Sequence, residues 1–148
     1  MSGGNCGNCG GCSCGGLKMR LIQFCALVSR AWSRETASPS CQGQWDPANP
    51  AYGQCAVTAL LVQDRFGGDL LRTVAENRGS HYYNRLPNGW EVDLTRSQFP
   101  PDQRFEPADA RTREYALDSP GAVAARTRER YELLKAAVAR LEAQASPP

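Results

Sequence analysis

The sequence predicts an α+β fold in which helices near both ends of one domain flank a small antiparallel sheet. Two helical patterns of apolar residues, with one β-hairpin pattern between them, indicate this class. The length of 148 residues suits one domain, and 41% hydrophobic and 22% charged residues are typical of a globular chain. We expect a single domain over residues 17–146, preceded by a disordered Cys- and Gly-rich head over residues 1–16.

A first helix is predicted over residues 17–32. Its apolar side chains recur at intervals of three and four residues, which places them on one face of a helix. Residues 33–50 are rich in Ser, Pro, Gly and Asn and therefore predict a long loop. The apolar face of the first helix holds Leu17, Leu21, Phe24, Val28 and Trp32.

A second helix is predicted over residues 55–66, beginning at Cys55. Val57, Leu60 and Leu61 follow its helical rhythm. Gly67-Gly68 ends it, because glycine readily takes the left-handed conformation found just beyond many helices. Residues 70–75 then predict a strand that leads into the hairpin.

The stretch SHYYNRLPNGWEVDLT predicts the hairpin itself. Pro87-Asn88-Gly89 suits a three-residue loop, with proline at the second position of a type I turn and glycine at the left-handed position. This loop pairs Leu86 with Trp90 and then Arg85 with Glu91, as a cross-strand ion pair. A two-residue loop would exchange the two faces, and the apolar set would no longer share one face. The predicted core face holds Leu86, Trp90, Val92, Tyr82 and Leu94.

The same register places His81 and Asp93 together on the polar face of the hairpin. They are diagonal neighbours on adjacent strands, roughly 7 Å apart, which is within reach of a side-chain hydrogen bond. His81 is the only histidine in the chain. Any histidine-dependent chemistry must therefore use this position.

The last part of the chain predicts a loop and a helix. Residues 96–118 are loop-like, and Ser119-Pro120 starts the helix, since serine is a good cap and proline suits the first turn. Residues 146–148 predict a frayed tail. The face of this helix that packs on the body holds Thr127, Tyr131, Leu134, Val138 and Leu141.

Cys55 is the leading functional candidate because it stands where a loop enters a helix. The unpaired N–H groups and partial positive charge of a helix start favour a thiolate and can stabilise an oxyanion. A thiol nucleophile also needs a base and a group that orients the base, which His81 and Asp93 would supply. The alternative is that Cys55 is a buried structural thiol and His81 a polar residue with satisfied hydrogen bonds.

The order of these residues resembles the transglutaminase-like branch of the papain-like superfamily. The matching residues are Cys55 at a helix start, His81-Tyr82-Tyr83 on a strand and Asp93-Leu94-Thr95 on the next strand. The resemblance implies a papain-like/transglutaminase-like core, with the nucleophile-bearing helix packed on a small antiparallel sheet. It also implies Cys55 as nucleophile, His81 as base and Asp93 as the residue that orients it.

Several amides are candidates for oxyanion or substrate contacts. The two that we favour are Gln54, directly before Cys55, and Asn84, on the same strand as His81. Asn49 and Gln98 are further candidates. For all four amides the alternative is a hydrogen bond within a loop, which explains each of them better than a functional role. Asn49 lies six residues before Cys55, where papain-like enzymes carry glutamine, so the sequence departs from the superfamily at this point.

A closer resemblance is to the YunG-like family of small bacterial proteins. The phrases GQCAVTALLVQDRFGG, SHYYNRLPNGWEVDLTRSQF and RYELLK carry it. Tyr83 stands where members of this family usually have tryptophan. The family has no settled activity, so this resemblance implies a fold more than a function.

The head is a second candidate site. Its four cysteines form the pattern C-x2-C-x2-C-x-C, in which the C-x2-C steps allow two thiolates to reach one ion. Zinc, copper or an iron–sulfur cluster would suit four thiolates, and a head that binds nothing is the alternative. The four residues are Cys6, Cys9, Cys12 and Cys14.

Composition narrows the function classes. The formal net charge of +2 argues against a nucleic-acid partner, and no apolar run is long enough to predict a membrane span. The clustered cysteines and the lack of a signal-peptide pattern favour a reducing, cytoplasmic location.

From the Cys55, His81 and Asp93 candidates we expect a thiol-dependent hydrolase or acyltransferase acting on the amide or thioester of a small molecule or peptide. The alternatives are a non-catalytic binding or structural protein, or metal or redox chemistry in the head; the core itself needs no cofactor.

Overall fold

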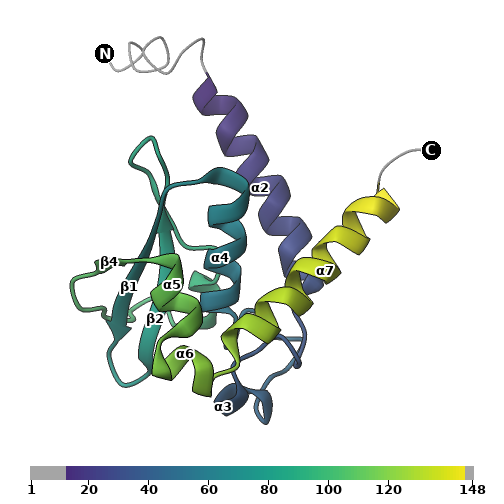
Figure 1. Cartoon of the computed structure of the whole chain (residues 1–148). Coiled ribbons are helices and arrows are strands. Elements are labelled where there is room, and N and C mark those ends of the chain that lie inside the picture. Colours follow the sequence, from purple (N-terminus) through teal and green to yellow (C-terminus); the bar gives the residue numbers. More distant parts are fainter. Residues whose placement is uncertain (1–12, 146–148) are drawn as a thin grey trace.

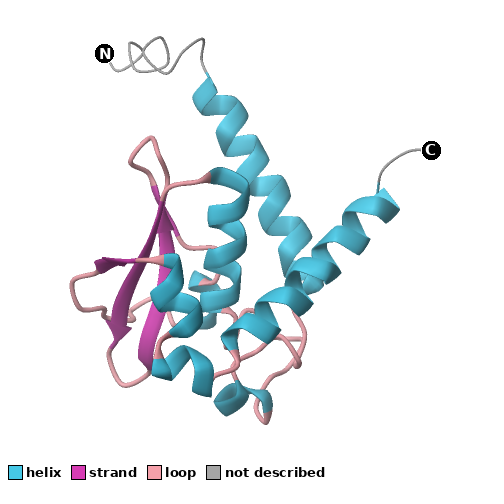
Figure 2. Cartoon of the chain, in the orientation of Figure 1, coloured by secondary structure: helices cyan, strands magenta, loops and turns pink. Residues whose placement is uncertain are grey.

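The computed structural model describes residues 13–145, which form helices packed against one face of a small sheet (Figures 1 and 2). Helix α4 lies at the centre, between the sheet on one side and helices α2 and α7 on the other. The elements in chain order are α2 (Ser13–Ala31), α3 (Pro39–Gln42), α4 (Cys55–Phe66), β1 (Asp69–Ala75), β2 (Gly79–Arg85), β3 (Glu91–Val92), a 3-10 turn (Arg96–Gln98), β4 (Asp109–Arg111), α5 (Arg113–Asp118), α6 (Pro120–Ala124) and α7 (Thr127–Ala145).

The predicted α+β class is confirmed, and the sheet is antiparallel throughout. Its strand order is β3-β2-β1-β4. Strands β1 and β2 pair along their whole length, with Thr73 opposite His81 and Arg72 opposite Tyr82. Helix α4 packs on the face that carries Asn84, whose Nδ2 donates to the Ala59 carbonyl at 3.0 Å. The helix that begins at Cys55 is therefore tied directly to the strand that carries His81.

The three-residue hairpin loop is confirmed. The Leu86 N–H donates to the Trp90 carbonyl at 2.7 Å, and Arg85 lies opposite Glu91 in the register. Gly89 has a φ of 93°, which is the left-handed conformation that the loop requires. Loop length therefore determined the register, as the sequence predicted.

Two side-chain predictions for the hairpin were wrong. Trp90 is 37% exposed, because it directly follows the exposed turn and precedes the short β3, so it lies outside the core. Arg85 pairs with Asp69 at 3.1 Å and not with Glu91. Asp69 is opposite Arg85 on the longer neighbouring strand β1, which offers a competing carboxylate on the other side.

Both terminal helices differ from their predicted bounds. Helix α2 begins at Ser13, inside the segment predicted to be disordered; residues 1–12 are outside the described part of the chain. The single last helix is divided into α6 and α7, with Arg126 between them at a φ of 54°. The loops predicted before these helices also hold short elements, namely α3, β4 and α5.

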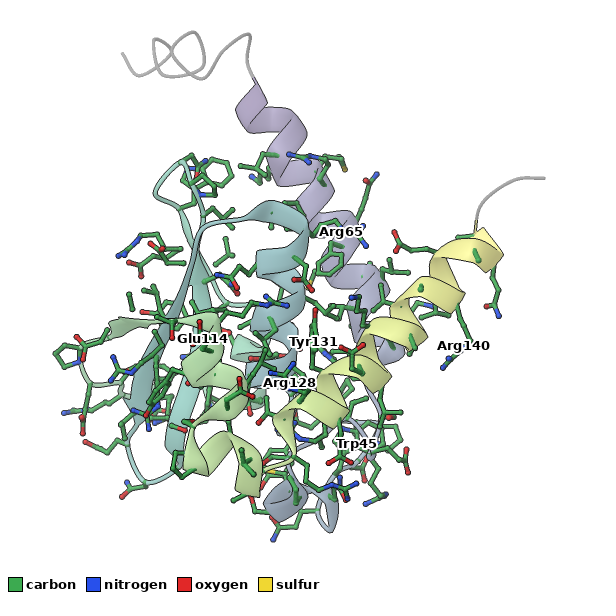
Figure 3. All side chains as sticks on the ribbon, in the orientation of Figure 1. Trp45, Arg65, Glu114, Arg128, Tyr131 and Arg140 are labelled. Atoms are coloured by element: carbon green, nitrogen blue, oxygen red, sulfur yellow. The ribbon has the colours of Figure 1, made fainter. Side chains whose placement is uncertain are left out.

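The core forms where α2, α4, α7 and the sheet meet. Polar side chains within it are paired: the Trp32 indole donates to the Thr58 hydroxyl at 2.9 Å. Tyr131 lies on α7, on the side that faces α4 (Figure 3). Its hydroxyl donates to Asp64 at 2.5 Å, and Arg113 of α5 pairs with the same carboxylate at 2.7 Å. Burial and the Asp64 carboxylate raise the pKa of Tyr131 to about 12. These contacts fix the helices around α4.

No helix within residues 13–145 combines the length and apolar character needed to cross a membrane.

Candidate active site

The turn before α4 places Cys55 at the first position of the helix. Gly53 has a φ of 76°, and a Cβ at that position would lie 2.8 Å from the Cβ of Cys41. Its carbonyl accepts from Ser38 N–H at 2.9 Å, and its own N–H donates to Oε1 of Gln98 at 3.3 Å. Glycine at 53 thus lets two loops close around the start of α4. The Cys55 thiol, only partly buried, stands at the positive end of that helix.

The predicted contact between His81 and Asp93 is confirmed. The His81 ring is 1% exposed, and its Nε2 lies 2.6 Å from Oδ2 of Asp93. The other carboxylate oxygen accepts from the Thr95 N–H at 3.1 Å and from the Thr95 hydroxyl at 3.2 Å. Thr95 therefore holds Asp93, and Asp93 in turn holds the imidazole through Nε2.

Aromatic rings enclose the imidazole of His81. Phe99 packs edge-on at 4.8 Å between centroids, Tyr83 stacks at 6.0 Å, and Phe105 lies at 5.7 Å. These contacts restrict rotation of the ring and keep water from most of it. The imidazole consequently has one defined orientation, with Nδ1 left for another partner.

The thiol of Cys55 is electrostatically coupled to this imidazole. Nδ1 of His81 is buried and has no hydrogen-bond partner among the described residues. Cys55 and His81 nevertheless each shift the pKa of the other. The His81 ring lines a pocket of about 280 Å³ together with Tyr83, Asp93 and Phe105, and Cys55 borders a different one.

The pKa shifts of the two groups are reciprocal. Burial alone would lower the pKa of His81, but hydrogen bonding to Asp93 and to Cys55 raises it from 6.5 to about 9. Burial alone would raise the pKa of Cys55, but His81 and the Tyr82 backbone N–H lower it below its usual 9.0. Both directions favour a thiolate–imidazolium pair.

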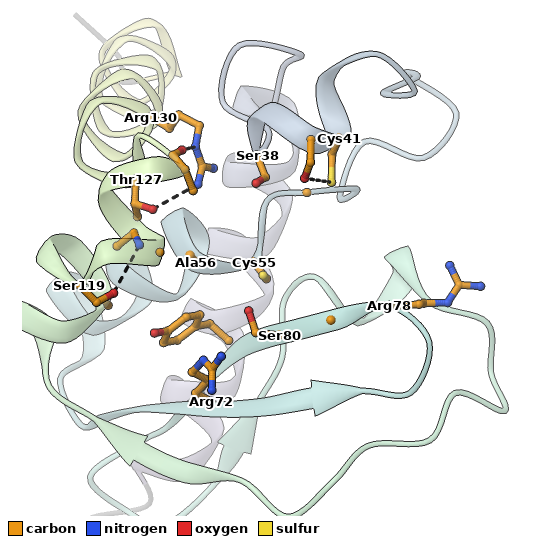
Figure 4. A pocket seen from close by; sticks show the side chains of 18 of the residues that line it. Ser38, Cys41, Cys55, Ala56, Arg72, Arg78, Ser80, Ser119, Thr127 and Arg130 are labelled. Carbon is orange, nitrogen blue, oxygen red and sulfur yellow. Dashed lines mark hydrogen bonds between the residues drawn. The ribbon is translucent and has the colours of Figure 1, made fainter.

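The thiol borders a cavity of about 680 Å³. Residues from the loop before α4, from β1 and β2, from α6 and from the start of α7 line it. Figure 4 shows Cys55 in the middle, with Ser80 beside it, Arg72 on one side and Arg130 on the other. The cavity is large enough for a small molecule or a few residues of a peptide.

The two favoured oxyanion candidates have structural contacts instead. Gln54 is fully buried; its Nε2 donates to the Ser33 carbonyl, and its Oε1 accepts from the Thr36 hydroxyl, both at 2.8 Å. The Asn84 side chain donates a hydrogen bond to the Ala59 carbonyl of α4. Neither side chain lines the cavity. Asn49 is exposed within a turn and likewise does not line it.

The amide that does line the cavity is Gln98. Its Oε1 is held by the Gly53 N–H, while its Nε2 is buried and has no hydrogen-bond partner among the described residues. A buried amide donor without a partner is unusual in a folded protein. Gln98 is one of the further candidates from the sequence. Its signal there is weak, because its approach to Gly53 depends on tertiary structure.

The predicted metal site in the head lies mostly outside the described residues. Cys6, Cys9 and Cys12 belong to residues 1–12, and the side chain of Cys14 is likewise not described. Within the described part of the chain, no three metal-ligating side chains come together. Metal binding by the head stays a prediction.

The fold and the site define a class: a small α+β protein with a cysteine at a helix start and a histidine–aspartate pair on a β-hairpin. Residues 20–142 match the family model described as YunG protein. The uncharacterised protein YunG of Bacillus subtilis (strain 168) is 32% identical over 114 residues, which cover 77% of this chain and 87% of that protein. The chain therefore belongs to the YunG family. No solved structure matches it closely enough to identify a fold relative.

Proposed function

We propose that this protein is a thiol-dependent hydrolase or acyltransferase that acts on an amide or thioester. The observation that carries the proposal is His81, whose Nε2 contacts Asp93 while its other nitrogen is left for Cys55. A buried imidazole held in this way has the geometry of a general base next to its nucleophile. The adjoining cavity gives the substrate a place to bind.

In the proposed reaction the Cys55 thiolate attacks the carbonyl carbon of the substrate. A C–S bond forms, and the carbonyl π electrons move to oxygen to give a tetrahedral oxyanion. The oxyanion collapses, the bond to the amine or thiol leaving group breaks, and the His81 imidazolium gives that group its proton. Water or a second nucleophile then attacks the acyl carbon and loses its proton to His81. The second tetrahedral intermediate collapses, the C–S bond breaks and the acyl product leaves, which restores the Cys55 thiolate and the His81 imidazolium.

Two donors support an oxyanion site in this proposal. The backbone N–H of Cys55 is in the first turn of α4, where N–H groups have no partner within the helix. The Nε2 of Gln98 is the second, since its Oε1 is already fixed by Gly53. We assign the oxyanion role to Gln98 rather than to Gln54 or Asn84, whose amides are engaged elsewhere.

The proposal includes a papain-like or transglutaminase-like core. The arrangement that supports it is α4, which begins at Cys55 and packs on the antiparallel sheet that carries His81. The alternative is a non-catalytic binding module on the same fold, in which the cavity holds a ligand without reacting. The reactivity of Cys55 separates the two.

The test is alkylation of Cys55 by iodoacetamide at a series of pH values, followed by peptide mass spectrometry. We expect Cys55 to react faster than free cysteine at pH 7, with a midpoint below 9.0, because its pKa is lowered. Cys25 and Cys41 in the same sample serve as internal controls. Reaction of Cys55 no faster than free cysteine would contradict the proposal.

The pH dependence of turnover and stability has a definite sign. Turnover should fall on the alkaline side near pH 9, where His81 loses the proton it gives to the leaving group.

Stability depends on pH through the same two groups. The raised pKa of His81 contributes to the free energy of unfolding fully below pH 6.5, and this contribution is lost as the pH rises through about 9. The lowered pKa of Cys55 contributes above pH 9.0, and this contribution is lost as the pH falls through that lowered pKa. Urea unfolding across this range, with His81→Gln as reference, measures both.

A further inference from the structure

The charged residues that line the cavity are all basic. They are Arg72 on β1, Arg78 in the turn after β1 and Arg130 on α7. Among residues 13–145, no aspartate or glutamate lines the cavity. Since walls of one charge sign focus the electric field within a cleft, this cavity attracts anions.

Arg72 and Arg78 have no acidic partner. No carboxylate of the described residues lies within 4.0 Å of either guanidinium, and Asp109, opposite Arg72 in the register, pairs with Arg111. Many arginines elsewhere in the described chain do pair with carboxylates, so the cavity differs from the rest of the surface. The paired ones are Arg65, Arg85, Arg111, Arg113, Arg126 and Arg128.

Arg72 lines the cavity from β1, the strand next to β2. It lies directly opposite Tyr82, whose backbone N–H interacts with the Cys55 thiol, so Arg72 is one strand further from the sulfur. Neighbouring strands are about 4.8 Å apart, a span that an arginine side chain crosses easily. The residue is partly buried, and no described residue accepts a hydrogen bond from its guanidinium. Its donors are free to bind a ligand.

Arg130 adds a fixed positive charge. It is only 4% exposed, and neutral oxygens hold its guanidinium: the carbonyls of Ala125 at 2.8 Å and Thr36 at 3.0 Å, and the Thr127 hydroxyl at 3.4 Å. No described carboxylate neutralises it. Its electrostatic partners are the thiols of Cys55 and Cys41. A buried charge with no carboxylate beside it is costly, so an anion in the cavity would be bound favourably.

We propose that the acyl group transferred by Cys55 carries an anionic substituent, a carboxylate or a phosphate, which Arg72 binds within the field of Arg130. A guanidinium binds either anion through two parallel hydrogen bonds. The inference rests on the proposed function and assigns it a substrate class. Neutral acyl groups would leave the arginines unpaired and would react more slowly.

The test compares two small reagents that differ in charge, iodoacetate and iodoacetamide. At Cys55 the second-order rate constant for iodoacetate is divided by that for iodoacetamide. This ratio is then divided by the same ratio for free cysteine, which removes the difference in intrinsic reactivity between the two reagents. We expect this normalised preference for iodoacetate to be about tenfold and to shrink as salt screens the charges. Arg72→Gln should reduce it severalfold and Arg72→Lys should preserve most of it.

Arg85→Gln is the matched control. It removes one charge from the neighbouring strand, but Arg85 pairs with Asp69 and does not line the cavity. We expect the preference for iodoacetate to remain unchanged in this variant. Circular dichroism of every variant verifies that the fold is intact, and the iodoacetamide rate shows whether Cys55 is still active.

The outcomes separate the two proposals. Rapid reaction with both reagents and a normalised ratio of one would overturn the anionic substrate and leave the proposed function standing. Slow reaction with both would overturn the proposed function and this inference with it. Protection of Cys55 from iodoacetamide by succinate or by inorganic phosphate then identifies which anion fits; protection by neither would also contradict the inference.

Discussion

Two helices of this protein each carry a partly buried thiol, and the two thiols differ in acidity. Cys25 lies in the middle of α2, where burial raises its pKa. Cys55 lies at the start of α4, where burial acts in the same direction but His81 and the Tyr82 backbone N–H reverse the effect. Burial alone therefore makes a thiol less reactive, whereas position at a helix start and an oriented imidazole activate it.

The largest expected effect comes from removing the imidazole. His81→Gln should lower turnover of an activated thioester by roughly 1,000-fold, because general-base catalysis typically contributes 100- to 10,000-fold. Alkylation of Cys55 at pH 7 should slow to the rate of Cys25, which is unchanged and measured in the same digest. If Cys55 keeps its rate in this variant, the difference between the two thiols does not come from His81.

The next effect separates oxyanion stabilisation from thiol activation. Gln98→Ala should lower the rate of acylation by an activated thioester by about 100-fold, as expected for loss of one oxyanion donor. It should leave alkylation by iodoacetamide unchanged, because that displacement forms no oxyanion. Stopped-flow acylation and alkylation kinetics measure the two rates. Equal losses in both would show that Gln98 positions the thiol and does not act on the oxyanion.

A smaller effect is expected from glycine substitutions next to the two thiol-bearing helices. Gly53→Ala forces a side chain into a left-handed position and against Cys41, at a cost of about 1–2 kcal/mol in the free energy of unfolding. Gly16→Ala is the control: the site is exposed within α2 and should stabilise the protein by about 0.5–1 kcal/mol. Urea unfolding measures both changes. Equal effects would mean that the turn before α4 is less constrained than its geometry indicates.

The smallest effect is expected at Thr95, which hydrogen-bonds the carboxylate of Asp93. Thr95→Val removes the hydroxyl that bonds Oδ1 of Asp93 but keeps the backbone N–H, so we expect about a threefold loss of Cys55 reactivity. Ser29→Ala, which removes an exposed hydroxyl bond within α2, should change nothing. Alkylation at pH 7 resolves the two variants. A loss as large as that of His81→Gln would show that Thr95 is essential to the orientation of the carboxylate.

The contact between His81 and Asp93 was predictable because it depends on local rules. Loop residues determine the length of the hairpin loop, and loop length determines which side chains share a face. The start of α4 at Cys55 was predictable for a similar reason, since an apolar helical rhythm begins there. Each of these inferences used fewer than about twenty neighbouring residues.

The cavity and its donors could not be predicted because they depend on contacts between distant segments. Gln98 reaches Gly53 across 45 positions, and Arg130 reaches Thr36 across 94. The error at Arg85 has the same origin: the hairpin offered Glu91, but β1 offered Asp69 from outside the hairpin. Gln54 and Asn84 were chosen for closeness in sequence to Cys55 and His81, whereas tertiary hydrogen bonds occupy both side chains.

The enclosure of His81 by Phe99, Tyr83 and Phe105 limits the routes by which a proton can travel. Nδ1 has almost no exposed surface, so a proton on that atom has no direct path to bulk water. Exchange at Nδ1 must therefore wait until the enclosing aromatic rings move apart. The rate of hydrogen exchange at this nitrogen would report how often that opening occurs.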